Sequence, residues 1–260
     1  MSNDRQAKIA AATGPQRNSN RTILGAVVAL LVVIGVIVGI VVGTRGNDEP
    51  AAEGNATNGA TSGEVKLPKG VADPHAPVVA TNDGVLRPGV PTLQIFEDFQ
   101  CPACKHAEDL FGPTIKDMGA KGEINVVYYV KTFMDDSLRN DSSKKVGNAA
   151  LCASDAGKFE DYHDKIYAKQ PTGEGTGYTD EQVQDAAGEA GITGAALDTW
   201  KQCVTDRTYV PYLNGLEEYT AQTMRVTSTP SFYVDNKRMA LRNEMTAEDF
   251  RTLIRETAAK

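Results

Sequence analysis

Residues 92–104 of the 260-residue chain read TLQIFEDFQCPAC, and this segment is the strongest indication of its fold. Thr92 to Phe96 is short, rich in β-forming residues and preceded by Pro91, which predicts a strand. After Cys104, apolar residues recur at helical spacing as far as Gly119, which predicts a helix. The two cysteines of the stretch therefore lie where a strand passes into a helix.

Further elements follow this junction. Pro113 lies inside the helical pattern and is expected to kink or break the helix. Ile124 to Lys131 (INVVYYVK) is nearly continuous in β-branched and aromatic residues, as in a strand that is buried on both faces. The next 87 residues, 137–223, show helical patterns only, with a capped helix start at Thr179.

Strand character returns at Ser231 to Val234, followed by a turn at Asp235-Asn236 and a short partner strand near 238–241. The chain closes with a helix that begins at a capping-box pattern on Thr246. A strand-helix-strand unit, an all-helical block and a hairpin-helix unit describe an α/β protein. We expect a thioredoxin fold with an inserted all-helical subdomain.

The first half of the fold should occupy residues 78–136, the helical insertion 137–223 and the second half 224–260. We find no internal repeat. Residues 43–77 are rich in Gly, Ala, Asn, Thr and charge, so we expect a flexible linker there.

Ile23 to Val42 holds twenty consecutive residues without a charge. As a helix they would extend about 30 Å, the thickness of the hydrocarbon core of a bilayer, which predicts one N-terminal transmembrane helix. Basic residues outnumber acidic ones in residues 1–22 but not after the helix, so the positive-inside rule places 1–22 in the cytoplasm and the rest outside. The alternative is a cleaved signal peptide, which usually has a shorter apolar region. Gly35, Gly39 and Gly43 also have the spacing of a helix-dimerisation pattern.

The composition is that of a globular protein, with 41 % hydrophobic residues and 24 glycines against 12 prolines. It excludes the collagen-like, coiled-coil and wholly disordered classes. The net charge is −7, and residues 1–22 hold four basic side chains and one acidic, so the remainder carries −10. An acidic chain without a basic stripe is not expected to bind nucleic acid.

Cys101-Pro102-Ala103-Cys104 places Cys101 at the N-terminus of the predicted helix. Unpaired backbone N–H groups and the helix dipole favour a thiolate there, so Cys101 should be the nucleophile. Cys104, one turn further on, is placed to resolve a mixed disulfide formed by Cys101. Proline is tolerated in the first helical turn because its missing N–H would be unpaired there.

Two other interpretations of the CPAC motif are weaker. Half of a zinc site would need two more ligands, and no second close pair exists among the remaining cysteines and histidines, which are His75, His106, Cys152, His163 and Cys203. A purely structural disulfide would not explain why the motif lies between a strand and a helix. We therefore expect neither a metal nor a cofactor.

The stretch Phe96–Cys104 (FEDFQCPAC) resembles the active site of the DsbA-like thiol:disulfide oxidoreductases. The resemblance covers about residues 78–260, and the predicted N-terminal anchor is consistent with the membrane-tethered members of the family in Gram-positive bacteria, including actinobacteria. It also includes three downstream segments, which are 149–153 (AALCA), 157–164 (GKFEDYHD) and 226–234 (VTSTPSFYV).

In the family, the residues that match Thr229-Pro230 form a cis-proline loop that faces the redox cysteines and binds substrate peptide. The alternative is an ordinary trans proline at the start of a strand. The chain departs from the family at Ala103, where many members have a histidine that stabilises the thiolate. It departs again at Ile95, where many members bury an acid.

Glu97 and Asp98 are candidates for proton transfer in place of that acid, although they could equally be solvated carboxylates at the end of a strand. His106 is expected to be a surface residue rather than a catalytic one. Cys152 and Cys203 lie within the helical block, and an oxidising exterior favours a structural disulfide between them over two free buried thiols.

The resemblance implies a membrane-tethered enzyme of the extracytoplasmic space that introduces disulfides into exported cysteine-containing proteins. It also implies a membrane partner of the DsbB or VKOR type that reoxidises Cys101 and Cys104. One alternative is a disulfide reductase or isomerase with the same fold, because redox poise depends on local electrostatics. Another is a peptide-binding module in which the CPAC disulfide is only structural.

Overall fold

The computed structural model describes residues 65–81, 84–242 and 244–260. The predicted membrane helix at 23–42 and the predicted cytoplasmic segment 1–22 lie outside these residues. Among the helices that are described, none combines the length and the apolar character needed to cross a bilayer.

The described residues form five strands and eight helices. The strands are β1 (Val78–Val79), β2 (Thr92–Glu97), β3 (Asn125–Val130), β4 (Ser231–Val234) and β5 (Lys237–Arg238). The helices are α2 (Pro102–Ala120), α3 (Met134–Leu138), α4 (Ser142–Asp155), α5 (Phe159–Ala168), α6 (Asp180–Glu189), α7 (Ala195–Thr205), α8 (Val210–Gln222) and α9 (Ala247–Ala258).

The strands form one sheet in the order β1-β3-β2-β4-β5. The central pair β2 and β3 is parallel, with α2 as the crossover between them, whereas β1, β4 and β5 are antiparallel to their neighbours. All six residues of β3 are buried, as predicted for a strand that is covered on both faces. This mixed sheet with its helices is the thioredoxin-like fold expected from the sequence.

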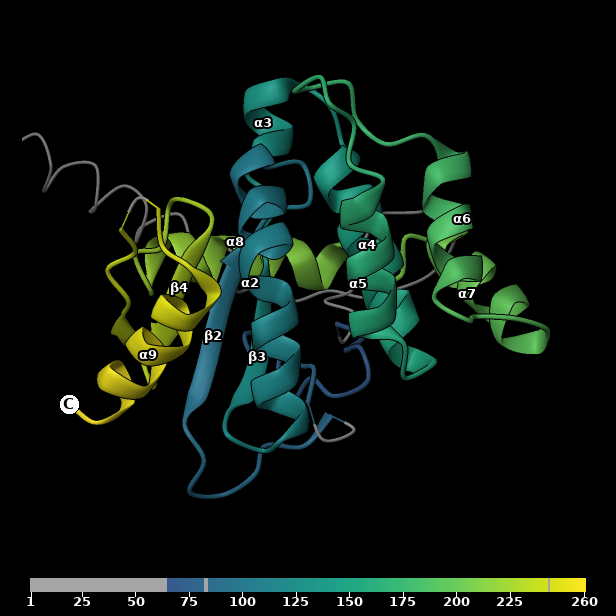
Figure 1. The fold of residues 1–260 in the computed structure, drawn as a ribbon. Coiled ribbons are helices and arrows are strands. Elements are labelled where there is room, and N and C mark those ends of the chain that lie inside the picture. Colours follow the sequence, from purple (N-terminus) through teal and green to yellow (C-terminus); the bar gives the residue numbers. More distant parts are fainter. Residues whose placement is uncertain (1–64, 82–83, 243) are drawn as a thin grey trace, which may run out of the picture. The chain divides into compact units, whose positions relative to one another are not determined.

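Helices cover both faces of the sheet (Figure 1). On one face, Phe111 of α2 stacks on Phe250 of α9, with ring centroids 4.3 Å apart, and Phe250 also contacts Phe232 of β4. On the other face, Phe96 of β2 stacks on Tyr129 of β3, and α8 packs against β3. Helices α3 to α8 all lie in sequence between β3 and β4, where the sequence predicted only helices.

Pro113 does not break α2, which is helical from Pro102 to Ala120. A proline removes only one helical hydrogen bond, that to the carbonyl group four residues earlier. Phe111, Ile115 and Met118 on either side are buried and hold the helix against its neighbours. Of the two predicted outcomes, a kink or a break, the break is wrong, because packing outweighs the lost bond.

Residues 65–77, which the sequence assigns to the flexible linker, pack against the helical insertion instead. Tyr212 Oη donates a hydrogen bond to Ala76 O at 2.6 Å, and the ring of His75 stacks on that of Tyr219 at 4.6 Å. The core also contacts three apolar side chains of this segment, Val65, Leu67 and Val71. The linker prediction is wrong here because these widely spaced apolar residues find partners only in the tertiary structure.

The structure confirms the helix caps and the hairpin turn that the sequence predicts. Thr179 and Thr246 both form capping boxes, and Asp235 and Asn236 both have positive φ angles, 48° and 66°, at the tip of the β4–β5 hairpin. The partner strand β5 is shorter than predicted and covers only Lys237–Arg238.

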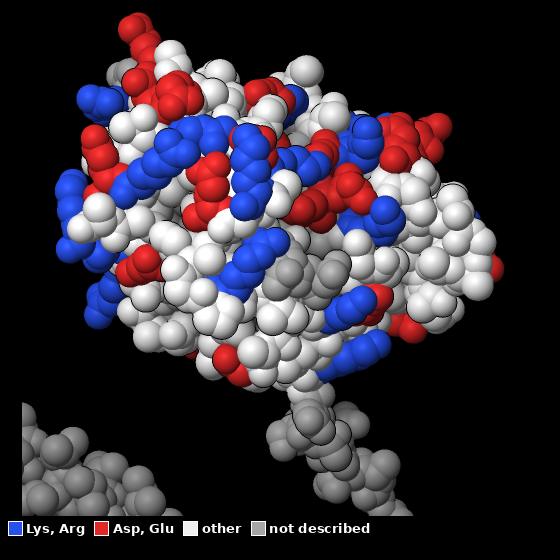
Figure 2. Space-filling model, turned by 60° about the horizontal axis from the view of Figure 1, so that its bottom comes forward, with Lys and Arg blue, Asp and Glu red and all other residues white. Residues whose placement is uncertain are grey.

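On the face shown in Figure 2, basic and acidic side chains are interspersed rather than gathered in a stripe of one sign.

Candidate active site

Cys101 is the N-cap residue of α2, directly after the turn that follows β2. Its backbone is extended, with φ −77° and ψ 117°, and Pro102 occupies the first helical position. Cys101 is 8 % exposed and Cys104 only 3 %, and both are free thiols, so the structure shows the dithiol form. The sequence predicted this placement from the strand, the motif and the helical spacing alone.

The Thr229-Pro230 peptide bond is cis, and this loop lies directly beside the redox cysteines. Cys101 Sγ is 3.6 Å from Thr229 O, although the two residues are 128 positions apart in sequence. Pro230 and Cys104 line the same small cavity. The cis-proline loop expected from the family resemblance is thus confirmed, and the alternative of an ordinary trans proline is excluded.

The two thiols have opposite acidities. A hydrogen bond from the Cys104 side chain, against the opposing effect of burial, lowers the pKa of Cys101 to about 6, and the backbone N–H groups of Cys104 and Ala103 contribute in the same direction. Burial raises the pKa of Cys104 well above that of a free thiol. The site therefore holds one thiolate and one thiol at neutral pH.

Glu97 lies on the same face of β2 as Ile95, because side chains alternate along a strand. It is 4 % exposed, and its Oε1 atom is 2.7 Å from Nε2 of His163 on α5, which is 1 % exposed. Burial by itself would lower the pKa of His163, but the carboxylate of Glu97 raises it well above the usual range. The two form a buried ion pair, and Glu97 lines the same small cavity as Cys104.

Asp98 is fully buried but points into a different hydrogen-bond network. Its Oδ1 accepts from Ser143 Oγ at 2.6 Å and from Gln100 N at 2.9 Å, and its Oδ2 accepts from Met134 N at 3.2 Å. Burial raises the pKa of Asp98 to about 7. Neither Glu97 nor Asp98 is therefore a solvated carboxylate at the end of a strand, and only Glu97 reaches the cavity of Cys104.

The helical insertion contributes further contacts that the sequence did not reveal. Gln170 and Tyr178 donate hydrogen bonds to backbone carbonyl groups of the turn that carries Cys101. The segment GKFEDYHD was part of the family resemblance, but nothing in it showed that His163 would meet Glu97. His106 is exposed on α2, as predicted.

The ligand atoms of Glu108, His163 and Asp164 come within 4.8 Å of one another, which is the spacing of a potential metal site. Two of these three groups already have protein partners. His163 bonds to Glu97, and Asp164 pairs with Lys116 of α2. The cluster is accounted for as a charge network between α2, α5 and β2.

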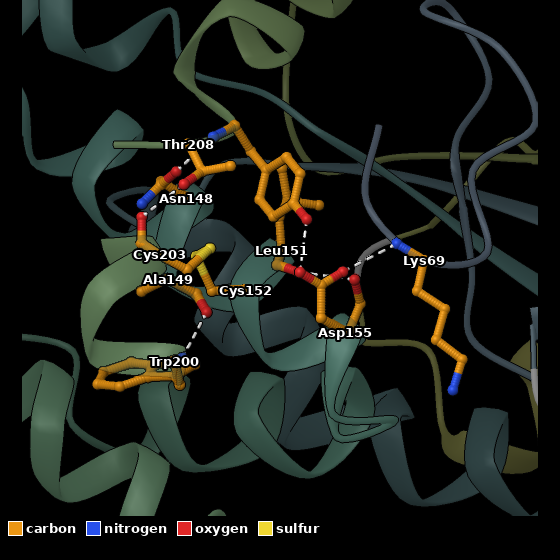
Figure 3. Close-up of a disulfide and its surroundings, with 11 residues drawn as sticks. Lys69, Asn148, Ala149, Leu151, Cys152, Asp155, Trp200, Cys203 and Thr208 are labelled. Carbon is orange, nitrogen blue, oxygen red and sulfur yellow. Dashed lines mark hydrogen bonds between the residues drawn. A yellow bond between two sulfur atoms is a disulfide. The ribbon is translucent and has the colours of Figure 1, made fainter. Parts of the chain in front are cut away.

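Cys152 of α4 and Cys203 of α7 are joined by a disulfide (Figure 3). They are 51 positions apart, with Cα atoms 5.9 Å apart. The ring nitrogen of Trp200, one turn before Cys203, donates to Ala149 O at 3.0 Å, which adds a second link between the same two helices. The structure thus places this pair inside the insertion, away from the CPAC motif.

Comparison with known proteins agrees with this geometry. The thioredoxin family matches residues 90–256, so the chain belongs to the thioredoxin family. Disulfide bond formation protein D of Bacillus subtilis (strain 168) is 26 % identical over 181 residues, which cover 69 % of this chain and 74 % of that protein.

Two solved structures from Mycobacterium tuberculosis are also similar. The reduced form of a disulfide bond oxidoreductase (DsbG) has a TM-score of 0.57 and 26 % identity, covering 73 % of this chain and 90 % of the other. Oxidised DsbA has a TM-score of 0.57 and 25 % identity, covering 71 % and 93 %. With the redox site described above, these relatives make the chain a DsbA-like thiol:disulfide oxidoreductase.

Proposed function

We propose that this oxidoreductase is an oxidase that introduces disulfide bonds into exported proteins, with its catalytic domain outside the cytoplasm and residues 23–42 as its membrane anchor. The observation that carries the proposal is the lowered pKa of Cys101, about 6, beside a buried Cys104 thiol. A stabilised thiolate stabilises the reduced enzyme, and a stable reduced form makes the disulfide form a stronger oxidant.

The size of this effect follows from the pKa. Compared with an ordinary thiol of pKa about 8.5, a thiolate with a pKa of about 6 is stabilised by about 1.4 kcal/mol at pH 7. For a two-electron couple this equals a rise of about 30 mV in reduction potential. A higher reduction potential of the Cys101–Cys104 pair favours the oxidation of substrate thiols.

The reaction would begin with the Cys101–Cys104 disulfide. A substrate thiolate attacks Cys101 Sγ, the bond between the two enzyme sulfurs breaks, and Cys104 leaves with the electron pair and takes up a proton. A second substrate thiolate then attacks the substrate sulfur of the mixed disulfide and releases Cys101 as a thiolate. The substrate has lost two electrons and the enzyme has gained them.

Thr229 and Pro230 are proposed to hold the substrate peptide during this exchange. The closeness of Thr229 O to Cys101 Sγ supports this role, since a peptide bound along the loop would bring its cysteine to the same sulfur. Glu97 is proposed to exchange the proton with Cys104, because both line one cavity of about 10 Å³, roughly the room that one water molecule needs. Asp98, whose side chain is turned into the network of Ser143, is not assigned this role.

A membrane reoxidant of the DsbB or VKOR type would return the electrons to a quinone, as the family resemblance implies. The deciding experiment is the reduction potential of the Cys101–Cys104 pair, measured by equilibration of the purified protein with glutathione buffers at pH 7. A potential clearly above that of thioredoxin, about −270 mV, supports the oxidase. A potential at or below that value would instead identify a reductase.

A further inference from the structure

The turn that carries Cys101 is held from outside the thioredoxin fold. We define residues 98–101 as the active-site turn and residues 169–179, between α5 and α6, as the insertion loop. Gln170 Nε2 donates to Phe99 O at 2.8 Å and to Cys101 O at 3.1 Å. Tyr178 Oη donates to Phe99 O at 2.8 Å. Two side chains of the insertion loop therefore bond to two carbonyl groups of the active-site turn. Phe99 O accepts from both, and Cys101 O also accepts from the backbone N–H groups of Cys104 and Lys105.

Both donors are fixed by the insertion itself. Tyr178 is 4 % exposed, its backbone N–H donates to Ser142 Oγ at 2.9 Å, and its carbonyl accepts from Lys145 Nζ at 2.6 Å. Lys169, the neighbour of Gln170, accepts a hydrogen bond on its carbonyl from a side chain of α6. The insertion loop is thus tied to α4 and α6 and presents its donors in a fixed position.

The active-site turn is also held on its other side. The side chain of Gln100 donates to Asp135 Oδ1 and exchanges hydrogen bonds with Asn140, all at 2.9 Å. Tyr167 Oη donates to Asp98 O at 3.3 Å. The insertion therefore contacts each residue of this short turn.

These contacts act on the Cys101 sulfur through the backbone of the active-site turn. A carbonyl oxygen carries partial negative charge that raises the energy of a nearby thiolate, and each donor that the oxygen loses strengthens this effect. A donor bound to that oxygen offsets its negative potential. The same bonds fix the turn, and so hold the sulfur at the first N–H groups of α2, where the helix end favours negative charge.

We propose that Gln170 and Tyr178 are positioning residues that set the reactivity of Cys101 through the carbonyl groups of Phe99 and Cys101. The inference rests on the proposed role of Cys101 as the nucleophile. It gives the insertion loop a part in the redox chemistry, although neither residue touches the substrate sulfur. The insertion then affects the stability of the Cys101 thiolate through these two carbonyl groups.

The test uses three variants of the full-length chain. Tyr178→Phe keeps the ring and removes only the donor, Gln170→Ala removes the carboxamide, and Gln170→Glu keeps its shape but loses the donor and adds a negative charge. In the reduced protein, thiolate absorbance at 240 nm is titrated against pH. We expect the Cys101 titration midpoint to rise by about half a pH unit in Tyr178→Phe and Gln170→Ala, the size expected for one lost hydrogen bond. Gln170→Glu should raise it further.

The same variants are then equilibrated with glutathione at pH 7. A half-unit rise in the midpoint should make the disulfide about threefold less oxidising. Two matched controls remove the same kinds of bond elsewhere. Tyr212→Phe removes a tyrosine hydroxyl that donates to Ala76 O, and Gln202→Ala removes a carboxamide that donates to Asp206 Oδ1.

Unchanged midpoints and equilibria in the Gln170 and Tyr178 variants would overturn the inference, and so would equal shifts in the two controls. Thermal melts of all five variants show whether each is folded. If Gln170→Ala does not fold, the test rests on Tyr178→Phe and Gln170→Glu, which preserve the shape of the side chain. Both measurements report on the Cys101 sulfur and do not depend on activity towards a peptide substrate. Shifts as expected in an enzyme that fails to oxidise peptides would therefore contradict the proposed oxidase and leave this inference standing.

Discussion

The molecule holds two cysteine pairs that burial alone does not distinguish. Cys101 and Cys104 are 8 % and 3 % exposed, and Cys152 and Cys203 are 2 % and 9 % exposed. The pairs differ in where their helices place them. Cys101 caps the N-terminus of α2, whereas Cys152 and Cys203 lie in the last turns of α4 and α7.

Helix ends have opposite electrostatics, and this explains the difference. Free N–H groups at an N-terminus stabilise a thiolate, and free carbonyl groups at a C-terminus disfavour one. Cys101 is therefore suited to react, while a disulfide between two C-terminal turns has little tendency to be opened by thiolate chemistry. The two pairs therefore differ in reactivity through the helix ends on which they lie, and within the first pair the deeper burial of Cys104 keeps that thiol protonated.

The largest expected effect comes from breaking the asymmetry within the first pair. Replacing Cys104 by alanine removes the thiol that resolves the mixed disulfide, so covalent complexes with cysteine-containing peptides should accumulate through Cys101 and turnover should cease. Non-reducing gels and mass spectrometry after incubation with an oxidised substrate detect them. Cys101→Ala is the matched control and should form none. Equal absence of complexes in both variants would favour the peptide-binding module over the enzyme.

The next effect concerns the second pair. Replacing both Cys152 and Cys203 by alanine opens a loop of about fifty residues, and the chain-entropy relation gives a loss of about 4 kcal/mol in the free energy of unfolding. Urea unfolding of the wild type and the double variant measures the change. The reduction potential of Cys101–Cys104 should stay the same, and a large change in it would show that the two pairs are coupled.

A smaller effect follows from the Cys101 pKa. Because this pKa is lower in the folded dithiol form than in the unfolded chain, the thiolate contributes stability that is complete above about pH 8.5 and is lost as the pH falls through about 6. The disulfide form has no such group. Between pH 7 and pH 5 the dithiol form should thus lose about 1.4 kcal/mol relative to the disulfide form.

Urea unfolding of both redox forms at the two pH values measures this difference. The rate of Cys101 alkylation should also reach half its maximum near pH 6, while Cys104 stays unreactive there. A Cys101 midpoint near 8.5 would contradict the thiolate assignment.

The smallest effect is expected from the loss of one hydrogen bond near the disulfide of the insertion. Tyr209 donates its hydroxyl to Asp155 at the end of α4, close to the Cys152–Cys203 disulfide. Tyr209→Phe should lower the free energy of unfolding by about 1 kcal/mol, as expected for one hydrogen bond, and leave the Cys101 titration unchanged. A shifted titration would show that the insertion transmits strain generally, and would weaken the specific role given to Gln170 and Tyr178.

Much of the fold could be predicted from local patterns. Alternating and helical periodicity located β2, β3, β4 and most helices, and turn and cap residues such as Asp235, Asn236 and Thr246 marked where elements begin and end. Residues 65–77 and strand β1 were missed because their contacts are with distant segments. The break expected at Pro113 does not occur, because the buried side chains of Phe111 and Ile115 hold the helix through contacts that the local sequence does not show.

The placement of Cys101 and Cys104 could be predicted from the sequence, since a strand, a CPxC motif and a helix in this order put one sulfur at a helix N-terminus. Which groups surround the motif depends on the tertiary structure. Thr229 O lies beside Cys101 Sγ, Glu97 pairs with His163, and Gln170 and Tyr178 bond to the active-site turn, although β2, the insertion and the cis-proline loop are tens of residues apart in sequence. Their meeting depends on how the sheet and the insertion pack, and packing is a property of the whole chain that no local pattern contains.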